Sequence, residues 1–339
     1  MTAQVKQQLK IRDSDIDVAR GVGMICVVLG HRIQFLELKY WIFLFHMPLF
    51  FILSGLNFKS RAIRSYSFQK ARSLIVPYIS YASIVLVLDN IISLQTVIKP
   101  YLDWPDPHFF VPRILFGGPL LVAAFAVFWF AGCLFISSSL FNAAANRWPL
   151  FDYRMLATVA GCYAVAMIEP AGLKLPQGSA AVPLAVVFIW AGAALALIRE
   201  RRAMLIVLCL ATVAAMLPFA RALDMRIPLN GTIGNPPLAI AISVLIVSAS
   251  SYIARIPWVA RGLIALGQAS LTIMFLHCLI LIHGRTVISD RYVLLVAALL
   301  LPLLVHWLLE RSAFTQRFVL GRRVPRPDPA GRLLGISKA

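Results

Sequence analysis

The feature that most constrains this chain is a series of long apolar segments separated by short polar ones. A helix needs about 20 such residues to cross a bilayer, and it satisfies its own backbone hydrogen bonds there. The sequence therefore predicts an all-α, polytopic integral membrane protein with about ten transmembrane helices. The candidate segments are 18–37, 41–58, 74–97, 119–140, 155–169, 180–198, 203–219, 232–253, 262–284 and 292–309.

The composition excludes an ordinary soluble domain. Hydrophobic residues make up 60% of the chain and charged residues only 14%, whereas a soluble domain has about 25% charged residues. The formal net charge is +18, and in a soluble protein such an excess would suggest nucleic acid. Here the cations cluster between apolar segments, where topology explains them. We expect membrane lipids around the chain and no nucleic-acid partner.

The basic clusters also predict the orientation, because cationic loops stay in the cytoplasm. Ten spans place three basic stretches, 59–72, 199–202 and the end after Glu310, on one side together with the N-terminus. The loop on the opposite side, 98–118, is nearly neutral and rich in Pro and aromatic residues. We therefore expect both termini to be cytoplasmic, with an N-terminal tail at 1–13, a membrane domain at 14–311 and a basic C-terminal tail at 312–339.

Metal and nucleotide motifs do not occur in the sequence. It contains no HExxH, no carboxylate cluster, no GxSxG and no P-loop. The five cysteines lie inside apolar segments without ligand or redox spacing, so we interpret them as small core residues. No metal cofactor is expected.

Charged residues line one face of the first predicted helix. In "DVARGVGMICVVLGH" the eleven steps from Arg20 to His31 make about three turns, so both side chains share a face, about 16 Å apart along the axis. Asp17 lies three residues before Arg20, on nearly the same stripe. Ionisable groups at membrane depth usually face the protein interior or a polar cavity. The plainer alternative is that Arg20 reaches the lipid headgroups beside Asp17, and that His31 is an interfacial histidine.

A second imidazole is expected at the depth of His31. His46 follows Trp41 by five residues, which places it about 7 Å below the outer edge of the antiparallel second helix. Two histidines from adjacent helices at one level indicate a polar site within the membrane. His277, in the ninth segment, is interpreted as a core histidine.

In these positions the sequence resembles the acyltransferase-3 family of bacterial membrane O-acyltransferases, especially the branch similar to fucose 4-O-acetylases. The family pattern of Asp, Arg, ten residues and a final "GH" is matched by "DVARGVGMICVVLGH". It continues with "FHMPLFFILSG" at 45–55 and "KARSLIVPY" at 70–78. Weaker echoes are "FWFAGCLF" and "GQASLTIMFLH". The resemblance extends from about residue 14 to residue 310, and its first 80 residues are the specific part.

This resemblance implies a ten-helix enzyme of the bacterial inner membrane. It would take an acyl group, acetyl by default, from cytoplasmic acyl-CoA and deliver it to a hydroxyl of a carbohydrate or glycolipid in a cell-surface or secreted glycan. The Arg and His of the family pattern correspond to Arg20 and His31, and the basic residue before "PY" corresponds to Arg72.

The chemistry of the residues agrees with such a reaction. Arg20, Lys70 and Arg72 are expected near the cytoplasmic face, where they could bind the phosphates of acetyl-CoA. The pantetheine arm would then span the distance to the imidazole. Asp17 is expected to orient Arg20.

Histidine suits the removal of a hydroxyl proton, because its unperturbed pKa is near 6.5. We therefore favour His31 as general base, with a nucleophilic role as the alternative. His46 could orient His31, stabilise the oxyanion or bind acceptor hydroxyls. A transporter or flippase for a glycan or small polar substrate is the other function class, because intramembrane Arg and His also mark substrate pathways.

Overall fold

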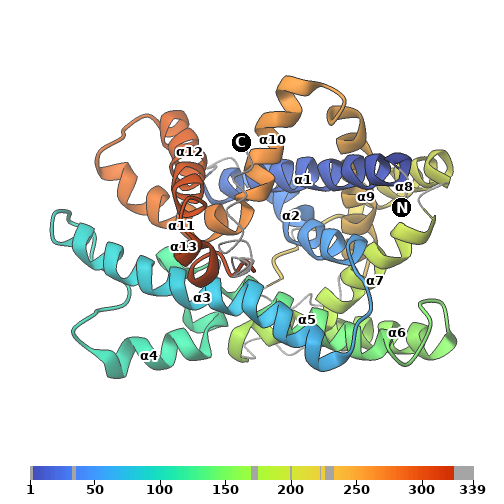
Figure 1. Ribbon diagram of the computed structural model, residues 1–339, viewed down its shortest axis with the longest axis horizontal. Coiled ribbons are helices and arrows are strands. Elements are labelled where there is room, and N and C mark those ends of the chain that lie inside the picture. The colour runs from blue at the N-terminus through green and yellow to red at the C-terminus, as the bar shows by residue number, and fades with distance from the viewer. Residues whose placement is uncertain are drawn as a thin grey trace, which may run out of the picture.

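The computed structural model describes residues 3–32, 36–168, 175–198, 201–221, 223–225 and 233–323. Over these residues the chain is helical and has no strand, as predicted (Figure 1). The α-helices are α1 (Ala3–Arg32), α2 (Leu36–Leu56), α3 (Ile63–Ser93), α4 (Pro107–Phe116), α5 (Trp129–Ala145), α6 (Tyr153–Ile168), α7 (Val182–Ile198), α8 (Arg202–Met216), α9 (Asn235–Ile253), α10 (Pro257–Gln268), α11 (Ser270–His283), α12 (Arg291–Leu309) and α13 (Ala313–Phe318). Short 3₁₀ helices include η1 (Gly118–Leu120), η2 (Ala123–Phe125) and η3 (Pro176–Ala181).

The helices long and apolar enough to cross a membrane are fewer than the ten that we predict. Among the described residues six qualify by length and composition, and the bent pair α10–α11 would make a seventh. The helices α6 and α8 are apolar but shorter. The helix α1 is long enough, but its last 18 residues hold four charged side chains, Asp15, Asp17, Arg20 and Arg32. Each predicted segment still coincides with helical structure.

The ninth predicted segment, 262–284, is not one straight helix. It breaks at Ala269 into α10 and α11, which are bent by 78° to each other. The helix α10 lies against α1, whereas α11 enters the interior, where most of its side chains are buried. Hydropathy cannot reveal this bend, because both halves are apolar.

The predicted tails are also partly structured. The N-terminal stretch belongs to α1 from Ala3 onward. On the C-terminal side, the hydroxyl of Ser80 in α3 donates a hydrogen bond to the carbonyl of Phe318 at 2.6 Å. The guanidinium of Arg72 donates to the carbonyl of Arg322, also at 2.6 Å. The chain up to residue 323 is therefore attached to α3, and residues 324–339 lie outside the described residues.

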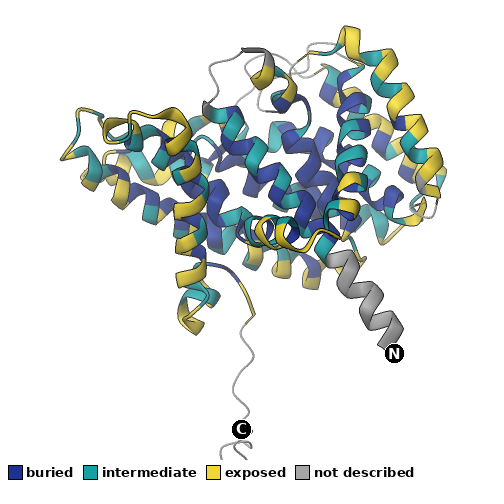
Figure 2. Cartoon of the chain, turned by 90° about the horizontal axis from the view of Figure 1, so that it is seen from above, coloured by how far each residue is buried: buried dark blue, intermediate teal, exposed yellow. Residues whose placement is uncertain are grey.

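Burial is arranged as expected for a membrane protein. Buried residues occupy the centre and exposed ones the periphery (Figure 2). The exposed face of α12 is apolar and includes Val293, Val296, Leu300 and Leu304. Such a face would be a liability in water but is suited to lipid.

Glycines bring α1 and α10 into direct backbone contact. A Cβ on Gly21 would overlap the carbonyl oxygen of Leu263, and a Cβ on Gly267 would overlap that of Asp17. Small residues allow such close approach of membrane helices. The contact fixes the end of α1 that carries Asp17.

A reciprocal glycine contact joins α2 to α7. A Cβ on Gly55 would overlap the carbonyl oxygen of Ile189, and one on Gly192 would overlap that of Ile52. The helix that carries His46 is thereby held as closely as α1.

The contact of α1 with α10 can be tested with two substitutions in one helix. Gly267→Val should lower stability by about 1–3 kcal/mol, because the side chain cannot fit against the α1 backbone. Gly262→Val is the matched control, since a Cβ there meets nothing within 4 Å. The measurement is the monodisperse fraction of detergent-solubilised protein after heating. Equal heat resistance of the two variants would contradict this packing.

The predicted orientation can be tested with reporter fusions. Fusions after residue 65 should report cytoplasm, because that segment carries the basic loop before α3. A fusion near residue 105, in the loop that precedes α4, should report the opposite side. The same result at both positions would refute the assigned orientation.

Candidate functional site

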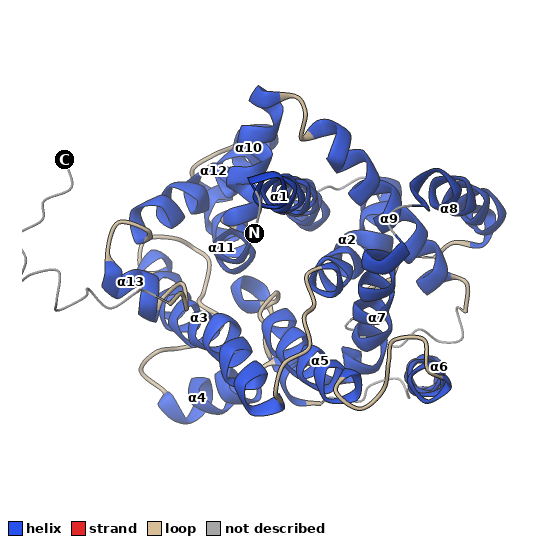
Figure 3. Cartoon of the chain, turned by 45° about the vertical axis from the view of Figure 1, so that its right-hand side comes forward, coloured by secondary structure: helices blue, strands red, loops and turns tan. Residues whose placement is uncertain are grey.

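Two cavities lie one after the other along the helices α1, α2, α5 and α11, and α3 also lines the first of them. These helices surround the centre of the molecule when it is viewed nearly along α1 (Figure 3). The first, here called the basic cavity, has a volume of about 480 Å³ and is lined by Arg20, Phe50, Phe130 and Ser270 among others. The second, here called the histidine cavity, is narrow, with a volume of about 20 Å³, and is lined by Val27, His31, Phe43, His46, Met47, Trp129 and Met274 among others.

The basic cavity concentrates positive charge. Its lining includes the four cations Arg20, Lys59, Arg61 and Lys70, and none of the described residues that line it is acidic. The first residues of α11, Ser270 and Leu271, also line it. The N-terminus of a helix attracts anions through its free N–H groups and its dipole. The bend before α11 therefore adds to a site suited to a multiply charged anion.

Asp17 holds Arg20 in place. Its carboxylate accepts a hydrogen bond from the Arg20 guanidinium at 2.9 Å. A second, longer contact comes from the side chain of Gln268 at the end of α10, at 3.5 Å. Asp17 thus acts at the Arg20 end of α1, and this placement favours a positioning role for it.

Arg72 lies apart from this set. It is not among the residues that line the basic cavity, and its guanidinium binds the C-terminal segment through the carbonyl of Arg322. Lys70, two residues earlier, does line the cavity, and its ammonium donates to the hydroxyl of Ser54 at 3.4 Å. The donor-binding role predicted for Arg72 therefore stays a prediction.

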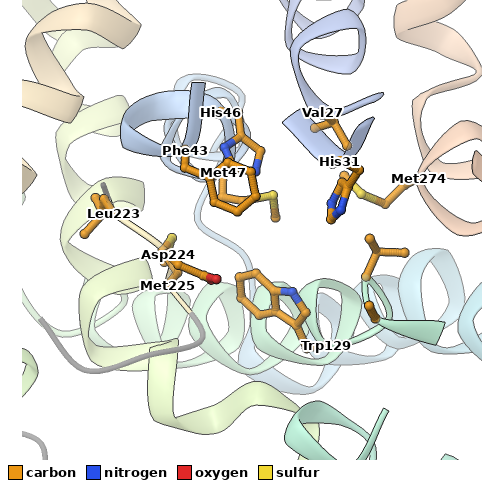
Figure 4. Close-up of a pocket in the computed structure, with 12 residues that line it drawn as sticks. Val27, His31, Phe43, His46, Met47, Trp129, Leu223, Asp224, Met225 and Met274 are labelled. Carbon is orange, nitrogen blue, oxygen red and sulfur yellow. The ribbon is translucent and has the colours of Figure 1, made fainter. Parts of the chain in front are cut away.

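His31 and His46 face the same cavity, as their predicted depths require (Figure 4). The ring of Phe43 lies close to both imidazoles. Its centroid is 6.1 Å from that of His31 and 4.7 Å from that of His46. We predicted that Arg20 and His31 share one face of α1. They line successive cavities, Arg20 the basic cavity and His31 the histidine cavity.

His277 is a buried core histidine, as predicted, but it lies beside His31 without lining either cavity. Its ring is fully buried, and its centroid lies 5.1 Å from that of His31. The signal available in the sequence was the family echo "GQASLTIMFLH", which ends at this residue. Local spacing could not pair it with His31, because the two residues are far apart along the chain.

Backbone hydrogen bonds set the tautomers of two of these histidines. The Nδ1 of His46 lies 2.8 Å from the carbonyl of Ile42, and the Nδ1 of His277 lies 2.9 Å from that of Ile273. Because a carbonyl only accepts, Nδ1 carries the proton in both rings. In the neutral ring Nε2 is then a hydrogen-bond acceptor.

One group of side chains here could hold a metal ion. The donor atoms of His31, His277 and Cys278 all lie within 4.8 Å of one another. Imidazole and thiolate are the ligands that zinc prefers. No spacing motif could have indicated this group, because His31 comes from a different helix. An ion bound there would be coordinated by a ring nitrogen of His31.

Asp224 is the acidic side chain of the histidine cavity, and our sequence interpretation missed it. It belongs to the described stretch 223–225, and its carboxylate points toward the indole of Trp129 (Figure 4). A single acid between two apolar segments gives no periodic signal that would have marked it.

The comparisons identify the family of the chain. A family model described as an acyltransferase domain matches residues 13–311, which include both cavities and every site residue named above. Comparison with curated proteins gave no match, and neither did comparison with solved structures. The chain therefore belongs to the acyltransferase-3 family, which is characterised by a membrane domain for acyl transfer.

Proposed function

We propose that this protein moves an acyl group, acetyl by default, from cytoplasmic acyl-CoA to a sugar hydroxyl of a cell-surface or secreted glycan. The observation that carries the proposal is the succession of two cavities along the same four helices. One is basic and the other is lined by histidines. A bacterial inner membrane is the location that this reaction implies.

The basic cavity is suited to the phosphates of coenzyme A. Arg20 and Lys70 carry the charge, and Arg binds phosphate bidentately. Asp17 fixes the Arg20 side chain and so reduces the entropy lost on binding. From Arg20 to His31 the helix rises about 16 Å, a distance that the thin pantetheine arm would span.

His31 is assigned as the general base. It takes the proton of the acceptor hydroxyl while the hydroxyl oxygen attacks the thioester carbonyl carbon. The carbon–sulfur bond then breaks, and the coenzyme A thiolate leaves with the proton that His31 returns. The acyl ester and free coenzyme A are the products, with no other reactant required.

The tautomer of His46 narrows its role. Its Nδ1–H is bound to the carbonyl of Ile42, so its Nε2 accepts rather than donates in the neutral ring. A neutral His46 can therefore accept a hydrogen bond from the acceptor hydroxyl, but its Nε2 cannot donate one to an oxyanion. His277 packs beside His31 and is assigned a positioning role.

A transporter or flippase remains the second candidate, and the bend between α10 and α11 favours it. Interrupted helices and intramembrane ionisable side chains also build transport sites. Purified protein incubated with acetyl-CoA labelled on the acetyl group separates the two candidates. Without an acceptor, an acyltransferase binds the donor and releases its labelled acetyl group to water as acetate with free coenzyme A, whereas a transporter does neither.

Donor binding should depend on the residues of the basic cavity. Arg20→Ala and Lys70→Ala should each weaken acetyl-CoA binding about tenfold or more, because a charge-assisted hydrogen bond is lost. Arg72→Ala should have a smaller effect, since that guanidinium binds the C-terminal segment. Isothermal titration with detergent-solubilised protein measures all three. Unchanged affinity in the first two variants would refute the donor site, and a loss as large in Arg72→Ala would restore that residue to it.

The reaction should depend on His31 separately from binding. His31→Ala should lower the transfer rate by about 10²–10⁴-fold and leave acetyl-CoA affinity intact. The exposed His108 provides the control, and His108→Ala should retain activity. A labelled acyl group trapped on wild type but not on His31→Ala would make His31 the nucleophile. Full transfer by His31→Ala would refute both roles.

A further inference from the structure

We propose that His31, His277 and Cys278 form a binding site for Zn²⁺, and that an ion bound there inhibits acyl transfer. The site itself stands on the geometry of these three side chains. The inhibition rests on the proposed function, in which His31 is the general base, and it adds a regulation of that same residue.

The two residues of α11 are arranged as a pair of ligands. The Sγ of Cys278 lies 3.4 Å from the Nε2 of His277. Neighbouring donor atoms around a tetrahedral zinc ion lie about 3.3–3.6 Å apart, because the bonds are about 2.0–2.3 Å long. Both side chains are buried in the interior of the bundle, so packing fixes their positions.

A hydrogen bond within α11 directs the lone pair of His277 toward the same point. The Nδ1–H of His277 donates to the carbonyl of Ile273 at 2.9 Å. In the neutral ring the lone pair is then on Nε2, which is the atom beside the thiol of Cys278. Histidines that bind metals commonly donate their other N–H to a carbonyl or carboxylate, which fixes the ring and its tautomer. His277 has this support in its own helix.

His31 provides the third donor atom from α1. The donor atoms of the three residues lie within 4.8 Å of one another. A movement of about 1 Å by the His31 ring brings its nitrogen to the spacing of a tetrahedral zinc site. The ring is only partly buried and lines the histidine cavity, so an ion can reach it from there.

The donor set and the space beside it suit zinc. Three protein ligands leave one of its four positions to water, and the histidine cavity, at about 20 Å³, has room for about one water molecule. Imidazole and thiolate favour Zn²⁺, whereas Mg²⁺ and Ca²⁺ prefer oxygen ligands. When the ion binds, the thiol of Cys278 releases its proton to water.

Zinc and the proton of the acceptor compete for one lone pair of His31. A neutral imidazole has a single nitrogen lone pair, because its other nitrogen carries a proton. Once that pair is donated to zinc, the ring cannot take a proton, whichever nitrogen binds the ion. The phosphates of the donor are assigned to the basic cavity, about 16 Å away along α1. Zinc should therefore slow the reaction without weakening acetyl-CoA binding.

The test uses full-length protein in lipid nanodiscs and acetyl-CoA labelled on the acetyl group, and it measures the labelled acetate released to water. Zn²⁺ at about ten times its Kd should lower the rate about tenfold, since about one molecule in eleven stays free of the ion. The same concentration of Mg²⁺ should have no effect. Co²⁺ in place of Zn²⁺ gives a second readout, because a cobalt–thiolate bond absorbs in the near ultraviolet.

Cys278→Ser should keep the metal-free rate and lose both the zinc inhibition and the cobalt–thiolate band. Cys26→Ser in α1 is the matched control, because that cysteine is less buried and lies outside the group, and this variant should behave as wild type. A wild type without the band, or a band that survives in Cys278→Ser, would overturn the site. Zinc binding that leaves the rate unchanged or raises it would overturn the inhibition. Absence of acetate release by metal-free wild type would instead refute the proposed function, while the cobalt band still decides the site.

Discussion

The cost of placing ionised side chains at membrane depth is the constraint on which this structure depends. An Arg at the centre of a membrane helix costs about 3 kcal/mol on insertion scales unless it finds a partner or water. Arg20 lies nearer the end of α1 that is predicted to be cytoplasmic, where its guanidinium enters a cavity and pairs with Asp17 at 2.9 Å. Glycine contacts hold α1 against α10 and α2 against α7, which fixes two of the helices that line the cavities.

The polar groups are sorted along one path. Cations lie at the end of α1 that is predicted to be cytoplasmic, and His31 and His46 line the cavity farther along. Each group suits the chemistry that we propose for it, namely anion binding and proton transfer.

The sequence was sufficient for features with a local period. The eleven steps from Arg20 to His31 place both on one face of any α-helix, and both line cavities of the same bundle. It was insufficient for features made by distant segments. His277 and Asp224 come from segments far along the chain, and no spacing pairs either of them with His31. Arg72 follows Lys70 by two residues in the sequence, yet its guanidinium donates a hydrogen bond to the carbonyl of Arg322 in the C-terminal segment. The bend at Ala269 is hidden within a continuous apolar run.

The central claim is that donor and reaction centre occupy successive cavities along α1, α2, α5 and α11. The most direct measurement is a cryo-electron microscopy structure in lipid nanodiscs with a non-hydrolysable acetyl-CoA analogue. The account predicts that the phosphates lie in the basic cavity between Arg20 and Lys70, and that the acyl end lies within hydrogen-bond reach of His31 through at most one acceptor hydroxyl or water. Phosphates bound elsewhere, or an acyl end remote from His31, would contradict it.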